Sequence, residues 1–99
     1  MAQLSLKMRI VDVPVGAVGV IVPANPARAY LALCNIGAGN CNLGFDAATP
    51  PALDAGWPLD AAAAAGRKGG SYIFETELVP NGAVSGFSAA GTKIAVVEG

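Results

Sequence analysis

The sequence predicts an all-β protein: a single jelly-roll-like β-sandwich or small barrel of seven or eight short antiparallel strands. Thirteen Gly and seven Pro divide the 99 residues into short segments, which is typical of strands joined by turns. The hydrophobic share is 54% but the aromatic share only 6%, so the core must consist mainly of small and β-branched side chains. A chain of this length buries one core. We therefore expect one domain over residues 1–99, with an extended loop at about 46–70.

The first two strands are short and bounded by proline. Residues 4–13 alternate between apolar and polar side chains, which predicts a half-buried strand that Pro14 either ends or marks as an edge strand. Residues 18–22 are a second, wholly apolar strand, which ends at Pro23. The apolar face of the first strand consists of Leu4, Leu6, Met8 and Ile10.

Residues 25–45 predict a β-hairpin with strands at 29–36 and 42–45. Between them, residues 37–40 are Gly-Ala-Gly-Asn, which can take the positive φ angles of a tight reversal. The strand at 29–36 is apolar on both faces, which indicates either a central strand covered on both sides or one side that faces a partner. Cys34 and Cys41 would form a diagonal pair, and two reduced, packed thiols fit this placement better than a disulfide.

Residues 46–70 are expected to be irregular, because Pro50 and Pro51 continue neither a strand nor a helix. Residues 60–66 predict one short helical turn, with Asp60 as its N-cap and Gly66 just past its end. So long a connection in so small a domain is typical of a binding loop or arm. Deletion of residues 47–68 should then abolish binding and leave the fold intact.

Three further strands complete the expected fold, at residues 71–77, 83–88 and 92–97. Turn-forming residues separate them, with Pro-Asn-Gly at 80–82 and Ala-Ala-Gly at 89–91.

The composition argues against catalysis and against nucleic-acid binding. The chain has no His, and so lacks the usual general base and the commonest metal ligand. Two Cys are too few for a zinc site, and Asp46, Asp54 and Asp60 match no compact calcium loop. Six basic and seven acidic residues offer no basic face for nucleic acid. We expect a protein that is not an enzyme, takes no cofactor and binds no nucleic acid.

Neither a signal peptide nor a run of about 18 apolar residues is visible, so we expect no membrane contact and synthesis in the cytoplasm. Sparse charge protects weakly against association. The composition therefore fits either a member of an assembly or simply a small Ala-rich protein.

Seven residues are candidates for contact with a partner. Arg28 could anchor the corner at residues 25–26 or bind a partner. Trp57 could anchor an interface or cap the sheet, and the basic pair at 67–68 could be a solvated loop tip or contact an acidic surface. The full candidate set is Leu4, Leu6, Arg28, Trp57, Leu59, Arg67 and Lys68.

An ordered set of motifs runs through residues 20–45 and 70–99. It comprises Asn25-Pro26-x-Arg28-x-x-Leu31-x-Leu33-x-Asn35-x-Gly37, Asn42-Leu43-Gly44-Phe45, Gly70-Ser71-Tyr72, Pro80-x-Gly82-x-Val84 and Gly91-Thr92-x-Ile94-x-Val96-x-Glu98-Gly99. The pattern resembles small β-domains in virion proteins of tailed bacteriophages, found as capsid decoration or head-fibre-type proteins and as modules of larger tail or fibre chains. The segment 46–69 is longer and richer in Ala than that resemblance implies.

The resemblance implies a structural role in the virion and supplies no catalytic residues. The expected function is an outer capsid decoration or cement protein that stabilises subunit junctions as a symmetric homo-oligomer, with a trimer favoured. Its partner would be the major capsid protein or another virion protein. The alternative is a receptor- or carbohydrate-binding module of a head fibre or tail tip, in which Trp57 would act with Tyr30 or Tyr72.

Overall fold

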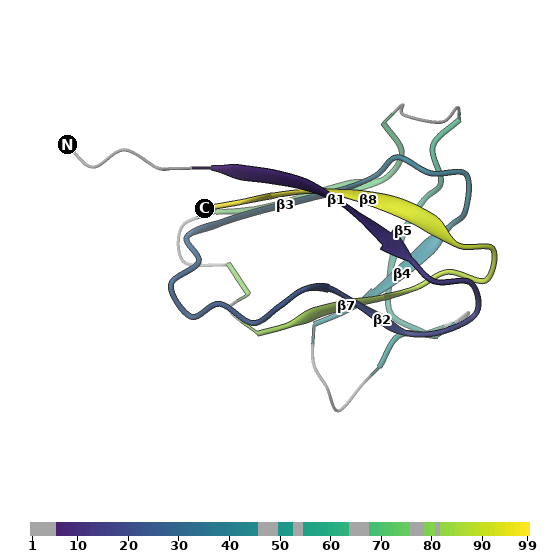
Figure 1. The fold of residues 1–99 in the computed structure, drawn as a ribbon, viewed down its shortest axis with the longest axis horizontal. Helices are drawn as coiled ribbons and strands as arrows, with labels where there is room; N and C mark the ends of the chain where they lie inside the picture. The colour runs from purple at the N-terminus through teal and green to yellow at the C-terminus, as the bar shows by residue number, and fades with distance from the viewer. Residues whose placement is uncertain (1–5, 46–49, 53–54, 64–67, 76–78, 81) are drawn as a thin grey trace.

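Eight strands, all paired antiparallel, form two four-stranded sheets in the computed structural model (Figure 1). The structure describes residues 6–45, 50–52, 55–63, 68–75, 79–80 and 82–99, and no helix occurs among them. The strands are β1 (Lys7–Val13), β2 (Gly19–Val22), β3 (Tyr30–Asn35), β4 (Cys41–Gly44), β5 (Trp57–Leu59), β6 (Ser71–Glu75), β7 (Val84–Phe87) and β8 (Thr92–Glu98). The predicted all-β sandwich is confirmed.

The strand orders are β1-β8-β3-β6 in one sheet and β2-β7-β4-β5 in the other. The pairs β1–β8, β2–β7, β3–β6 and β4–β5 are nested, as in one long hairpin folded over on itself. Alternate pairs fall in opposite sheets, which is the double Greek-key arrangement of a jelly roll. Consequently the first and last strands lie side by side, with Lys7 opposite Glu98.

The predicted hairpin at residues 25–45 is wrong. Strand β3 pairs with β8 and β6, whereas β4 pairs with β7 and β5, so the reversal at 37–40 crosses from one sheet to the other. The strand positions were predicted well, but their pairing depends on partners far along the chain. Turn residues alone could not reveal those partners.

Glycines in this reversal serve close packing rather than positive φ. The glycines with positive φ in the described ranges are Gly16, Gly56 and Gly91. A Cβ on Gly37 would instead lie 2.6 Å from the backbone nitrogen of Lys93, and one on Gly39 would lie 2.9 Å from Ser88 Oγ. The reversal therefore packs directly on the turn that leads into β8.

The segment at 46–70, expected to be one long loop, contains a strand that the sequence did not predict, β5. Pro58 interrupts the strand pattern in the sequence, yet proline is tolerated at this position because β5 lies at the edge of its sheet. Leu59 stands opposite Cys41 and is buried in the core. Deletion of residues 47–68 would remove this strand, so that deletion cannot be expected to leave the fold intact.

The predicted helical turn at 60–66 is not formed by residues 60–63, and residues 64–66 lie outside the described part. The Ala61 amide donates to Asn40 Oδ1 at 2.8 Å, and the Ala62 amide donates to the Gly37 carbonyl at 2.9 Å. These bonds hold the segment against the 37–40 reversal. Long-range partners thus replace the local bonds that a helix would need.

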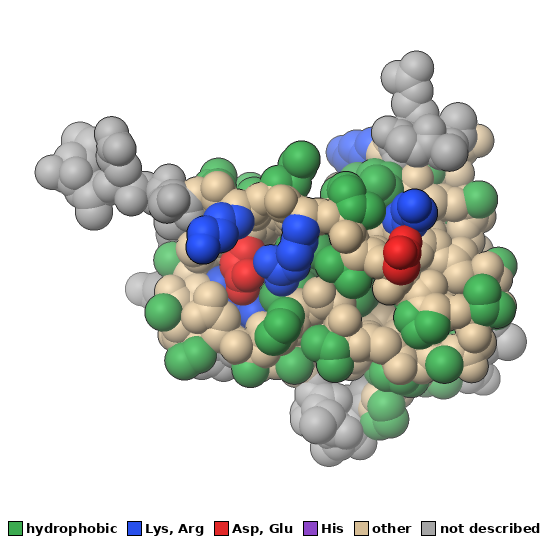
Figure 2. Space-filling view, in the orientation of Figure 1, with side chains coloured by type: hydrophobic (Ala, Val, Ile, Leu, Met, Phe, Trp, Pro, Cys, Tyr) green, Lys and Arg blue, Asp and Glu red, His purple; other side chains and the backbone are tan. Residues whose placement is uncertain are grey.

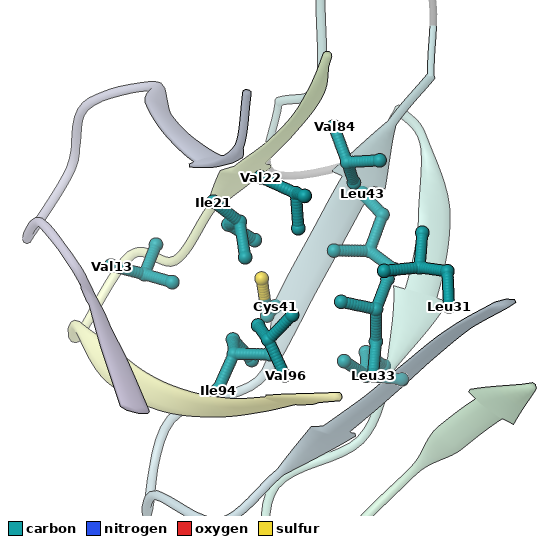
Figure 3. Close-up of a cluster of buried hydrophobic side chains, with 11 residues drawn as sticks. Val13, Ile21, Val22, Leu31, Leu33, Cys41, Leu43, Val84, Ile94 and Val96 are labelled. Carbon is teal, nitrogen blue, oxygen red and sulfur yellow. The ribbon is translucent and has the colours of Figure 1, made fainter. Parts of the chain in front are cut away.

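The core fills the space between the two sheets (Figure 3). Its side chains are aliphatic apart from one cysteine, as the composition predicts. They come from seven of the eight strands, all except β6, and point toward one another between the layers. The cluster consists of Val13, Ile21, Val22, Leu31, Leu33, Cys41, Leu43, Leu59, Val84, Ile94 and Val96.

Candidate functional site: an apolar outer sheet face

The side of the β1-β8-β3-β6 sheet that points away from the core is apolar. The register places Met8, Val97, Ala32 and Ile73 in one row across the four strands, and Ile10, Ala95, Cys34 and Ser71 in the next. We call these eight residues the outer face. Neither row contains a charged side chain.

The opposite side of the same sheet carries core residues, so this sheet is apolar on both sides. Antiparallel sheets commonly bury one side and keep the other polar. Here Met8 is 73% exposed, Ile10 50% and Ile73 61%. Apolar surface gathered on one sheet face indicates contact with something outside the domain.

The outer face has a distinct relief. Large side chains stand on its two edge strands, with Met8 and Ile10 on β1 and Ile73 on β6. The two central strands contribute the smaller side chains of these two rows. A shallow hollow of about 260 Å³ lies there, lined by Ala32, Leu33, Cys34, Lys68, Ser71, Ile73, Ala95 and Val97. The surface therefore consists of two ridges with a trough between them.

Strand β1 alternates between inward and outward side chains, and apolar side chains on its outward side are exposed to solvent. Val13 is buried and Val11 packs partly against the core, while Met8 and Ile10 of the opposite face point outward. Leu6 is 50% exposed just before the strand. The predicted half-buried strand is present, but its more apolar face is the free one. Leu4 lies outside the described residues.

Figure 2 shows the sandwich from the edge where β1 and β2 lie in front, and charged side chains gather there in two groups. One charged pair, Lys93 Nζ and Asp12 Oδ1 at 3.8 Å, is mostly exposed. The other group joins Arg9 Nη1 to Glu98 Oε1 at 3.3 Å. By register Arg9 and Glu98 share the core-facing side of the sheet with Val11, so of the two groups only the Lys93–Asp12 pair borders the outer face.

Arg28 is buried and acts inside the fold. Its Nε donates to Glu98 Oε2 at 2.7 Å, and its side chain is fully shielded from solvent. It also donates to the carbonyls of Pro23, Pro80 and Gly82. These bonds tie the 23–28 corner to the end of β8 and to the start of β7. Of the two interpretations, the structure places Arg28 as a corner anchor rather than at the surface.

Glu98 balances this buried cation. Burial of the carboxylate would raise its pKa, but the hydrogen bond and charge of Arg28 outweigh burial, with further hydrogen bonds from Arg9 and Asn25. The pKa of Glu98 is therefore lowered from its ordinary value of 4.5. Sequence analysis did not single out Glu98, although the resemblance motif contains it.

Asn35 is a second internal hub that sequence analysis missed. Its Nδ2 donates to the carbonyls of Gly39 at 2.8 Å and Leu59 at 3.0 Å. Its Oδ1 accepts from the Gly37 amide at 3.0 Å and from Thr92 Oγ1 at 2.7 Å. All four bonds are made by a side chain with no exposed surface. Asn35 thus fixes the reversal between the sheets and supports the end of the outer face.

Trp57 and Leu59 come from the same short strand but have different roles. Trp57 is 54% exposed and meets Tyr72 edge-on, with ring centroids 5.5 Å apart and planes at 64°. Because β5 and β6 are edge strands of opposite sheets, this pair closes one side of the sandwich. Leu59 is 1% exposed and its side chain belongs to the core. It therefore cannot make the partner contact that the sequence predicted for it.

The basic pair is only partly visible. Lys68 is exposed and contributes to the hollow of the outer face, while Arg67 lies outside the described residues.

The two cysteines lie in different sheets and are both free. Cys34 is partly exposed on the outer face, while Cys41 is buried among core side chains. Burial raises the pKa of the Cys41 thiol to about 11. The reactivity of the Cys34 thiol therefore reports whether the outer face is covered.

Within the described part of the chain, no group of three or more His, Cys, Asp or Glu side chains is placed to hold a metal ion. In the same ranges, no helix is long and apolar enough to cross a membrane. Comparison with known proteins finds no matching family model, no matching curated protein and no matching solved structure.

Proposed function

We propose that this chain is a non-enzymatic structural protein of a tailed-phage virion, most simply an outer capsid decoration or cement protein that acts as a symmetric homo-oligomer. The observation that carries the proposal is the apolar outer face, with Met8, Ile10 and Ile73 half or more exposed. The resemblance of the 20–45 and 70–99 motifs to phage virion domains supports the same role.

The proposed mechanism is burial of apolar surface at subunit junctions. The gain is roughly 25 cal/mol for each Å² of apolar surface removed from water. The sandwich holds this surface rigidly, because Arg28 and Asn35 fix the corners on either side of β3. A rigid face loses little conformational entropy on binding, which favours a cementing role.

The alternative function is recognition of a receptor or carbohydrate by a head fibre or tail tip. It would use Trp57 with Tyr72, which do lie together. Their planes stand at 64° and the Tyr72 hydroxyl donates to the Pro58 carbonyl, so the two rings form no shared flat platform for a sugar. The outer face is the larger apolar surface and favours assembly.

Cryo-electron microscopy of virions of the phage that encodes the chain tests the proposal. Copies spread over the whole capsid lattice, with β1 and the outer face at a subunit junction, are the expected result. Copies confined to a vertex or a tail tip would overturn decoration in favour of the recognition module. Absence of the chain from the particle would overturn both.

A further inference from the structure

We infer that the outer face binds the outer face of a second copy of this chain, sheet against sheet, around a two-fold axis. The inference names the contact within the proposed oligomer and to that extent rests on the proposed function. It also specifies a dimer, in place of the trimer that the sequence favours, because a flat face that packs on its own copy requires two-fold symmetry.

The relief of the surface indicates a second copy as the occupant. The same face carries both protruding side chains, such as Ile73 at its edge, and the trough formed by Ala32 and Ala95. When a copy is turned over and displaced by about one strand, its ridge lies above the trough of the first. Each copy then supplies the knob that fills the other's hollow, as an isologous interface requires.

Twist and charge favour the same partner. Two sheets pack face to face about 10 Å apart when their twists match, and a second copy has the same twist. The two rows of the face hold no charged residue, and Lys68, the charged residue that lines the hollow, is exposed, so its ammonium group can stay in solvent when the face is covered. Asp12 and Lys93 neutralise each other at one end of the face, 3.8 Å apart, and so add no net repulsion.

The size of the face predicts a modest affinity. A displacement of one strand leaves three strands in contact, and three strands about 4.8 Å apart with about six residues at 3.3 Å each give a flat area of about 300 Å². A standard stable interface buries about 800 Å² on each partner. We therefore expect self-association in the micromolar range, which a lattice that holds many copies would strengthen.

Analytical ultracentrifugation of the purified chain between about 1 and 200 µM tests the inference, since that range brackets micromolar binding. We expect a monomer–dimer equilibrium that Ile73→Glu weakens at least about tenfold, as loss of a central apolar contact does. Val20→Glu is the matched control, because Val20 is 61% exposed but lies on the other sheet; its dimerisation should be unchanged.

Ala95→Leu separates fitted packing from general apolar stickiness. It adds apolar surface but fills the trough, so the fitted dimer should weaken, whereas nonspecific association would strengthen. Alkylation of Cys34 in the wild-type chain is an independent test. The alkylation rate should fall as the protein concentration rises, while the rate of a reference modification at a residue other than cysteine should stay constant.

A chain that stays monomeric over this range, forms a trimer, or dimerises more tightly with Ala95→Leu would overturn the inference. An equal loss of association in Val20→Glu would also overturn it. A monomer in solution that is nevertheless found across the capsid lattice would overturn the inference alone and leave the proposed function standing.

Discussion

Replacement of Glu98 by Gln should destabilise the protein more than its position near the C-terminus suggests. The substitution removes the negative charge that faces Arg28, whose side chain has no exposed surface. The Gln side chain can still accept a hydrogen bond, but the buried guanidinium then has no counter-charge. Breaking a buried ion pair in this way costs about 3 kcal/mol.

Urea denaturation at about 1 µM protein measures the effect with self-association kept small. With a slope near 1.5 kcal/mol/M, the midpoint should fall by about 2 M and the slope should stay constant. Asp12→Asn is the matched control, because it removes the exposed pair with Lys93. That pair should contribute less than about 1 kcal/mol.

The pH dependence gives a second measure of the same ion pair. The folded-state pKa of Glu98 lies below its ordinary value of 4.5. Its stabilisation is therefore fully present above 4.5 and is lost as the pH falls through the folded-state value. The wild type and Glu98→Gln should differ most near neutral pH and converge in acid. A midpoint shift below about 0.5 M, or a difference that grows in acid, would show that Glu98 does not stabilise the fold by balancing the charge of Arg28.

Three further outcomes follow from the packing. Asn35→Ala should lower the free energy of unfolding by about 3 kcal/mol or more in urea titrations, since it leaves several buried polar groups without a hydrogen-bond partner. A loss under about 1 kcal/mol would show that the hydrogen bonds of Asn35 do not stabilise the fold. Gly37→Ala should lower the melting temperature clearly and Gly82→Ala hardly at all, because a Cβ meets Lys93 backbone nitrogen at 2.6 Å in the first case and only a carbonyl at 3.9 Å in the second. Mass spectrometry after iodoacetamide treatment of the dilute native protein should show Cys34 modified well before Cys41, whose thiol is buried and has a pKa raised to about 11; equal rates would mean that the core opens readily.

Local patterns in the sequence were enough to locate seven of the strands. Alternation and turn residues placed β3 and β8 within one or two residues of their observed bounds. Strand pairing was not available from the same patterns, because the partners of β3 lie 37 to 67 residues further along the chain. Strands β3 and β4, although close in the sequence, belong to different sheets. The short strand β5 was missed because Pro58 interrupts its pattern.

The candidate site was only partly predictable. The double apolar character of residues 29–36 predicted a central strand covered on both sides or one with a side that faces a partner, and β3 is a central strand of its sheet. The alternation of residues 4–13 supplied Met8 and Ile10 of the outer face. Arg28 stood out in the sequence, but its burial follows from carbonyls at residues 23, 80 and 82 that converge only in the fold. Ile73 gave no signal, since its outward direction depends on the register between β6 and β3.

Protection of Cys34 on the assembled particle measures whether the outer face is covered when the protein functions. Cys34 lies in the second row of that face. Alkylation of Cys34 should be at least about tenfold slower on the particle than in the dilute free protein, as for a group taken out of solvent contact. Equal rates in the two states would show that the outer face stays open to solvent on the particle and does not form a subunit junction.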